Sequence, residues 1–133
     1  MGIDPKAFVA TIRDIVAKQP DKVYSLPTEY DEESGQDIDR ECQYVEYDKH
    51  DHLVGSCLLG HALLELGVEP RKLDVITMGF VDLEKKLELG LPSAVVSWAV
   101  TVQDEQDDFK PWGVAVELAD AAVSPAELQL VTR

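Results

Sequence analysis

Proline and glycine divide the 133-residue chain into short segments, and this punctuation restricts the fold more than any other feature. Pro5, Pro70, Pro92 and Pro111 each open a stretch in which apolar residues recur at helical spacing. Proline is tolerated in the first turn of a helix because the N–H that it lacks would have no partner there. The pattern therefore predicts amphipathic helices that begin at these positions.

Six helices follow from this punctuation and from the apolar period. Asp4 is the predicted N-cap of the first helix and Ser56 that of the second, which Gly67 ends in a left-handed cap. Gln106 closes the apolar stripe of the fifth helix. The predicted helices run from Pro5 to Gln19, from Cys57 to Leu66, from Pro70 through Ile76, from Phe80 to Leu89, from Ser93 to Gln106 and from Pro111 to Ala122.

The first half of the chain also carries strand patterns. Val23–Leu26, Cys42–Tyr47 and Leu53–Val54 contain β-branched and aromatic residues, and a polar turn precedes the last of them. The length fits one domain with one core, and apolar residues make up 45% of the chain, as in globular proteins. We expect an α+β fold: a mostly helical single domain, residues 1–133, with a small antiparallel sheet of two or three strands. The polar segment 27–40 is predicted to be an exposed, mobile loop.

The acid in this chain is concentrated in two places. Ten of the 26 Asp and Glu residues lie between Glu29 and Asp51, and four more lie in residues 104–108. With a net charge of -14, such a surface repels nucleic acid and anionic lipid and favours a basic partner. The predicted partner-binding residues are Glu29, Asp31, Glu32, Glu33, Asp37, Asp39, Glu41, Asp104, Glu105, Asp107 and Asp108.

Five soft-metal ligands lie within twenty residues: Cys42, His50, His52, Cys57 and His61. A tetrahedral zinc could be assembled from them, but no Cys-x-x-Cys pair fixes the spacing, and we predict no metal. Cys57 at a helix start with His61 one turn later could also form a reactive thiol, although nearby carboxylates would raise its pKa. Without a secretory signal, the two cysteines are expected to be reduced.

Other chemical signatures are missing from the sequence. Residues 55–60 have the wrong spacing for a phosphate-binding loop, and residues 104–108 lack the layout of a calcium loop. We therefore predict no cofactor and no catalytic residue. Trp98 and Trp112 fall on apolar helical faces, so these two and the neighbouring Phe109 are predicted to be core residues. No apolar run approaches the ~20 residues of a membrane-spanning helix, and we expect a cytoplasmic protein.

Two groups of residues carry a resemblance to a known family. One is Ser56-Cys57-Leu58-Leu59-Gly60-His61-Ala62-Leu63, which runs into Leu66-Gly67-Val68; the other is Trp98, Gln103, Gln106-Asp107 and Trp112-Gly113. They resemble small uncharacterised proteins of actinobacteria and their phages, over the region from Val23 to Ala121. The resemblance implies a phage or actinobacterial accessory protein in a bacterial cytoplasm, and it implies no chemistry. The acidic insertion after Pro27 departs from the family pattern.

The leading hypothesis is a non-enzymatic accessory protein that binds a host protein through its acidic surface. One alternative is a small zinc- or thiol-dependent enzyme centred on Cys42, Cys57 and His61. Another is a DNA mimic, whose carboxylates would imitate two rows of phosphates and occupy a nucleic-acid-binding protein. A third is a homo-oligomer in which Cys57, His61 and Leu64 form the contact between copies.

Overall fold

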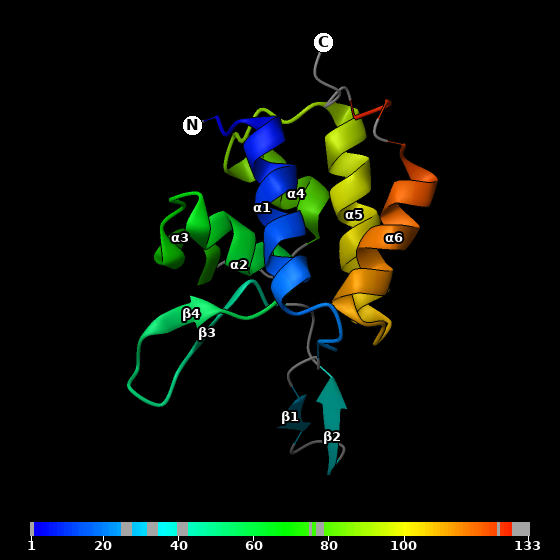
Figure 1. Ribbon diagram of the computed structural model, residues 1–133. Coiled ribbons are helices and arrows are strands. Elements are labelled where there is room, and N and C mark those ends of the chain that lie inside the picture. Colours follow the sequence, from blue (N-terminus) through cyan, green and yellow to red (C-terminus); the bar gives the residue numbers. More distant parts are fainter. Residues whose placement is uncertain are drawn as a thin grey trace.

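A computed structural model describes residues 2–24, 28–31, 35–39, 43–74, 76, 79–124 and 126–128, with the strands at 28–31 and 36–39 described by their backbone (Figure 1). Six helices and four strands form within these ranges. The helices are α1 (Pro5–Lys18), α2 (Leu58–Glu65), α3 (Pro70–Asp74), α4 (Phe80–Lys86), α5 (Ser93–Asp107) and α6 (Trp112–Ala122). The strands are β1 (Thr28–Asp31), β2 (Gln36–Asp39), β3 (Val45–Tyr47) and β4 (Leu53–Gly55).

The strands form two separate antiparallel hairpins, β1–β2 and β3–β4. The mostly helical α+β fold is therefore confirmed, with its strands in the first half of the chain. Of the strand predicted at residues 23–26, the structure describes Val23 and Tyr24, and Val23 forms an isolated bridge with Pro111. Within the segment 27–40, the structure describes the backbone of β1 and β2, and the mobility of this segment stays a prediction.

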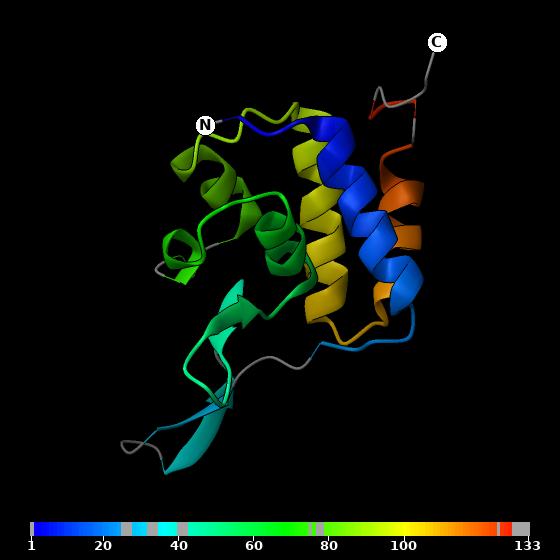
Figure 2. The same ribbon diagram turned by 60° about the vertical axis from the view of Figure 1, so that its left-hand side comes forward.

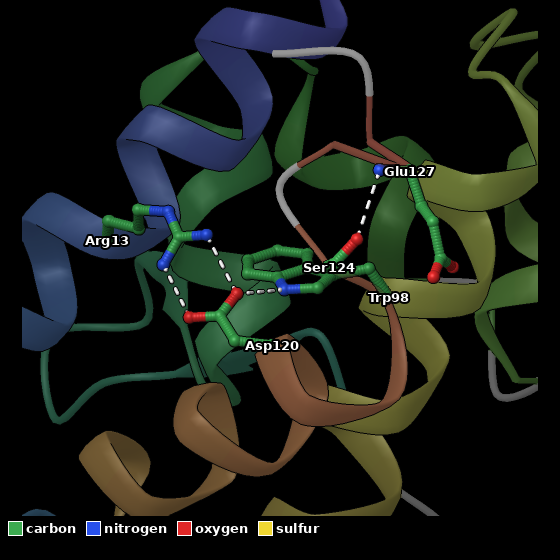
Figure 3. A network of polar contacts seen from close by, with 5 residues as sticks. All are labelled: Arg13, Trp98, Asp120, Ser124 and Glu127. Carbon is green, nitrogen blue, oxygen red and sulfur yellow. Dashed lines mark hydrogen bonds and ion pairs between the residues drawn. The ribbon is translucent and has the colours of Figure 1, made fainter. Parts of the chain in front are cut away.

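The three longest helices lie side by side: α1, α5 and α6 (Figures 1 and 2). Both oxygens of Asp120 on α6 accept hydrogen bonds from Arg13 on α1, at 2.8 and 2.9 Å, and Trp98 Nε1 on α5 donates to the same carboxylate at 3.0 Å (Figure 3). The Arg13 guanidinium also lies 5.4 Å from the Trp98 ring centre. The Arg13 ion pair, together with the Trp98 hydrogen bond, lowers the pKa of Asp120. One carboxylate thus joins three helices at the edge of the core.

The shorter helices α2 and α4 pack against α1 and α5, and one continuous hydrophobic core joins all these elements. Phe8 of α1 stacks on Phe80 of α4 with ring centres 5.5 Å apart. Trp98 and Trp112 are completely buried, as predicted. Asp4 caps α1 by accepting a hydrogen bond from the Lys6 N–H, which confirms the first helix start.

Two buried glutamines of α5 supply the caps that α2 and α4 need. Gln106 Oε1 accepts a hydrogen bond from the first N–H of α2, that of Leu58, at 2.7 Å. Gln103 Oε1 accepts one from the first N–H of α4, that of Phe80, at 3.1 Å, and its Nε2 donates to the buried Tyr44 hydroxyl at 2.9 Å. Helix ends buried without such partners would leave desolvated N–H groups. The two amides therefore fix where α2 and α4 start relative to α5.

The N-cap of α2 is Cys57 rather than the predicted Ser56. Cys57 Sγ accepts a hydrogen bond from Gly60 N–H at 3.4 Å. Ser56 is unavailable because its hydroxyl lies 3.2 Å from the Tyr24 hydroxyl and its N–H donates to the Tyr44 carbonyl. A Cβ on Gly60 would overlap that same carbonyl, so only glycine allows the residue before β3 to pass this close to α2.

Replacing either capping glutamine by leucine should destabilise the fold. Gln103→Leu and Gln106→Leu keep an apolar side chain of similar size but leave a buried N–H without an acceptor, which costs about 1–3 kcal/mol of unfolding free energy. Urea denaturation measures the loss. Ser97→Ala, an exposed change on the same helix, should stay within about 0.5 kcal/mol of the wild type. Leucine variants as stable as Ser97→Ala would contradict the capping role.

Candidate functional site

The β1–β2 hairpin lies in the segment between residues 24 and 43, and hydrogen bonds hold the two ends of this segment together. The Tyr24 hydroxyl lies 3.4 Å from both the carbonyl and the N–H of Gln43, and it also contacts the buried Ser56. Residues 24 and 43 therefore meet beside the start of α2. From this base the hairpin extends away from the helices (Figure 2).

The bend between α5 and α6 lies next to the same base. Trp112 N–H donates to the Lys22 carbonyl at 2.8 Å, Gly113 N–H donates to the Pro20 carbonyl at 2.9 Å, and Val23 bridges to Pro111. The hairpin and the bend consequently occupy the same end of the molecule, opposite to the start of α1 and the end of α6 (Figures 1 and 2). The β1–β2 hairpin and the bend, which both come from acid-rich segments of the sequence, therefore lie at the same end of the molecule. We call the β1–β2 hairpin together with residues 104–110 the acidic end.

The predicted partner-binding residues divide into two groups. Asp104 and Asp108 are exposed, while Glu105 and Asp107 are partly buried. The hairpin positions Glu29, Asp31, Asp37 and Asp39 are placed by their backbone, and their side chains lie outside the described part of the structure, as do Glu32, Glu33 and Glu41. The two rows of carboxylates that a DNA mimic requires would involve these side chains.

Lys110 is the cation of the bend. Its Nζ lies 2.6 Å from Glu105 and 2.8 Å from Asp108, and these contacts raise the pKa of Lys110 and lower that of Asp108. Burial and the neighbouring Glu105 raise the pKa of Asp104. One lysine among four carboxylates leaves the bend with a net negative charge at the C-terminal end of a helix, where the macrodipole is also negative.

Three helices of this chain end in the same hydrogen-bonded motif, in which one residue adopts the left-handed conformation. At α2 that residue is Gly67 (φ 93°), at α4 it is Glu88 (φ 53°) and at α5 it is Phe109 (φ 64°). The N–H pairs at the three ends are equivalent: Gly67 and Val68, Glu88 and Leu89, and Phe109 and Lys110. A bulky side chain in this conformation costs roughly 1–2 kcal/mol, which glycine avoids.

The end of α5 differs from the ends of α2 and α4 in the residue that follows the left-handed position. Val68 and Leu89 are buried there and make the apolar contact typical of the motif. At α5 this place belongs to Lys110, and the contact is its ion pair with Glu105. The apolar residue of the bend is instead Phe109, which is 55% exposed. The prediction that Phe109 lies in the core was therefore wrong.

Glycine at either strained position should stabilise the protein. Phe109→Gly and Glu88→Gly relieve the left-handed strain and lose part of that gain to the greater freedom of glycine in the unfolded chain. A net rise of roughly 0.5–1 kcal/mol in unfolding free energy is expected. Thermal and urea unfolding measure it. Gly67→Ala introduces the same strain and should lower stability; a loss of stability in Phe109→Gly would show that the ring holds the fold together.

The proposed metal ligands lie apart in the part of the chain that the structure describes. Cys57 is completely buried, with its sulfur engaged as the cap of α2. His50 and His52 lie in the exposed β3–β4 turn with ring centres 6.4 Å apart, and Cys42 lies outside the described residues. Among described residues, no group of three His, Cys, Asp or Glu side chains could hold a metal ion.

His61, the candidate thiol base and a candidate contact between copies, is partly buried against the fold. Its ring meets Trp112 edge-on, with centres 5.8 Å apart, and a Cβ on Gly55 would collide with it. Burial, and then the nearby Lys22, lower the pKa of His61, while Glu46 and Glu65 partly oppose the shift. With Cys57 in the core and Leu64 partly buried, the face predicted for homo-oligomer contacts is largely covered by the chain itself.

This environment predicts a pH dependence of stability. The unfolded chain, in which histidine titrates near pH 6.5, binds a proton that folded His61 resists. The unfolding free energy should therefore fall, relative to His61→Gln, as the pH is lowered from about 7 to about 5. Parallel urea titrations of the wild type and of the two variants His61→Gln and His50→Gln measure this difference. The exposed His50 is the control, and equal pH profiles for wild type and His61→Gln would contradict the prediction.

A pocket of about 360 Å³ opens between the β3–β4 hairpin and α3. Tyr47, Leu53 and Pro70 contribute its apolar lining, and Asp51, His52, Glu69 and Arg71 its polar lining. The Tyr47 hydroxyl donates to Asp74 at 3.3 Å. No motif in the sequence indicates this pocket, because its walls come from residues about twenty positions apart.

Comparison with protein-family models, with curated proteins and with solved structures gave no match. None of the described helices is long and apolar enough to cross a membrane. Function must therefore be inferred from the geometry of the chain itself.

Proposed function

We propose that this is a non-enzymatic accessory protein that binds a basic surface of a host protein through its acidic end. The observation that carries the proposal is the position of the β1–β2 hairpin and the bend, which are more than sixty residues apart in the sequence, at one end of the molecule (Figure 1). Carboxylates gathered in this way attract a cationic partner over distances near the Debye length and speed its association.

The bend adds support because its negative charge opposes its own helix. Carboxylates in the last turn of α5 weaken that helix by about 0.3–1 kcal/mol for each uncompensated charge. Lys110 offsets only part of this. Selection for partner binding would explain why the chain keeps a surface that lowers the stability of its own fold.

The source of the protein belongs to the same proposal. The resemblance of the α2 segment and of the Gln106-Asp107 and Trp112-Gly113 pairs to proteins of actinobacteria and their phages supports a phage-encoded protein that acts in the host cytoplasm. In this proposal, the acidic insertion after Pro27 supplies the binding surface that is particular to this chain.

A comparison of two variants of equal charge tests the proposal. Asp37→Asn, Asp39→Asn, Asp104→Asn and Asp108→Asn together neutralise the acidic end. Asp14→Asn, Glu88→Gln, Glu117→Gln and Glu127→Gln neutralise as many exposed carboxylates elsewhere. Each protein is used to capture partners from an actinobacterial lysate at about 0.1 M and about 1 M salt, between which the Debye length falls from about 10 Å to about 3 Å.

We expect the wild type and the control variant to retain one host protein at low salt and to release it at high salt. The acidic-end variant should retain it at least about tenfold more weakly. Equal capture by both variants, or capture that does not depend on salt, would rule out binding through the acidic end.

A further inference from the structure

Exposed apolar side chains gather at the acidic end, although they are scarce elsewhere on the described surface. Val23 is 45% exposed beside Pro111, Phe109 is 55% exposed in the bend, and Val114 is 39% exposed in the first turn of α6. Leu118 follows Val114 by one helical turn on the same face of α6. Four of the six large apolar residues exposed among the described residues therefore lie on α6 or beside its start. Such a grouping is typical of an interaction surface.

Phe109 is the largest of these side chains, and it lies outside the hydrophobic core. The two other helices that end in the same motif place Gly67 or the polar Glu88 at its position. At those helices the following apolar residue is buried, whereas Lys110 at the bend pairs with Glu105 and Asp108. An exposed aromatic ring therefore stands in a strained backbone position, framed by carboxylates.

We propose that Phe109 is the apolar anchor by which the acidic end holds its partner. The matching partner is an amphipathic protein segment whose apolar strip is flanked by lysine or arginine. Charge complementarity supports this occupant, because the carboxylates beside Phe109 repel an acidic surface and attract cations at the rim. A purely apolar surface would desolvate these carboxylates without pairing them. Aromatic anchors ringed by polar groups carry much of the energy of protein interfaces. The inference rests on the proposed function and adds the chemistry of the partner to it.

Two synthetic peptides of equal charge serve as probes. One has about 14 residues, with leucine on one face of a helix and lysine on the other, and the second has serine in place of leucine. Binding of each to the full chain is measured by fluorescence anisotropy at low and high salt. We expect the wild type to bind the leucine–lysine peptide about tenfold more tightly than the serine–lysine peptide.

Phe109→Gly should bring the two affinities to within about twofold, and Phe109→Tyr should keep the preference because it keeps the ring. Glu88→Gly is the matched control, since it makes the same backbone change at the end of α4 and should bind like the wild type. Phe109→Asn removes the ring with a residue that tolerates the left-handed conformation, so it separates the ring from the backbone.

The outcomes distinguish the two proposals. If both peptides bind the wild type equally and salt weakens both, the acidic end stands and the anchor is overturned. If neither peptide binds, or if salt has no effect, the proposed function fails and the anchor fails with it. Self-association of the wild type that Phe109→Gly abolishes, measured by light scattering, would place the ring in a second copy and overturn the proposed partner.

Discussion

The hydrogen bonds that two amide side chains of α5 accept from the first N–H groups of α2 and α4 hold the rest of the structure in place. Gln103 and Gln106 are almost completely buried and lie one turn apart, so one face of α5 sets the positions of two other helices. Gln103 also reaches Tyr44, whose carbonyl accepts from Ser56 just before α2. Because unsatisfied buried N–H groups are costly, this arrangement has few alternatives.

The same network positions the acidic end. Gln106 fixes the last turn of α5, and Asp107 accepts a hydrogen bond from its Nε2 at 3.0 Å. Ser56, next to the α2 cap, contacts Tyr24, which closes the base of the segment that carries the hairpin. The bend and the hairpin are therefore both anchored on the well-packed interior, at neighbouring positions. A rigid base that presents charge and an exposed ring loses less entropy when it binds than a free loop would.

Some elements could be predicted because their signals are local. The Asp4 cap, the left-handed Gly67 and the apolar stripes of α1, α5 and α6 each depend on residues within one or two turns. The N-cap of α2 was misplaced because the Ser56 hydroxyl is occupied by Tyr24, thirty-two residues away. The β1–β2 hairpin was missed because its polar residues lack the alternating apolar pattern that indicates a strand. The polar Gln106 at the end of an apolar stripe was a usable signal of a buried cap.

The sequence by itself determined that the chain forms short helices with an apolar core and that its acid is concentrated in two segments, because periodicity and charge are properties of neighbouring residues. Only the tertiary structure decided that those two segments share one end of the molecule and that Phe109 stands outside the core. Those outcomes depend on contacts between distant residues, such as Leu58 with Gln106 and Val23 with Pro111, which no local pattern specifies.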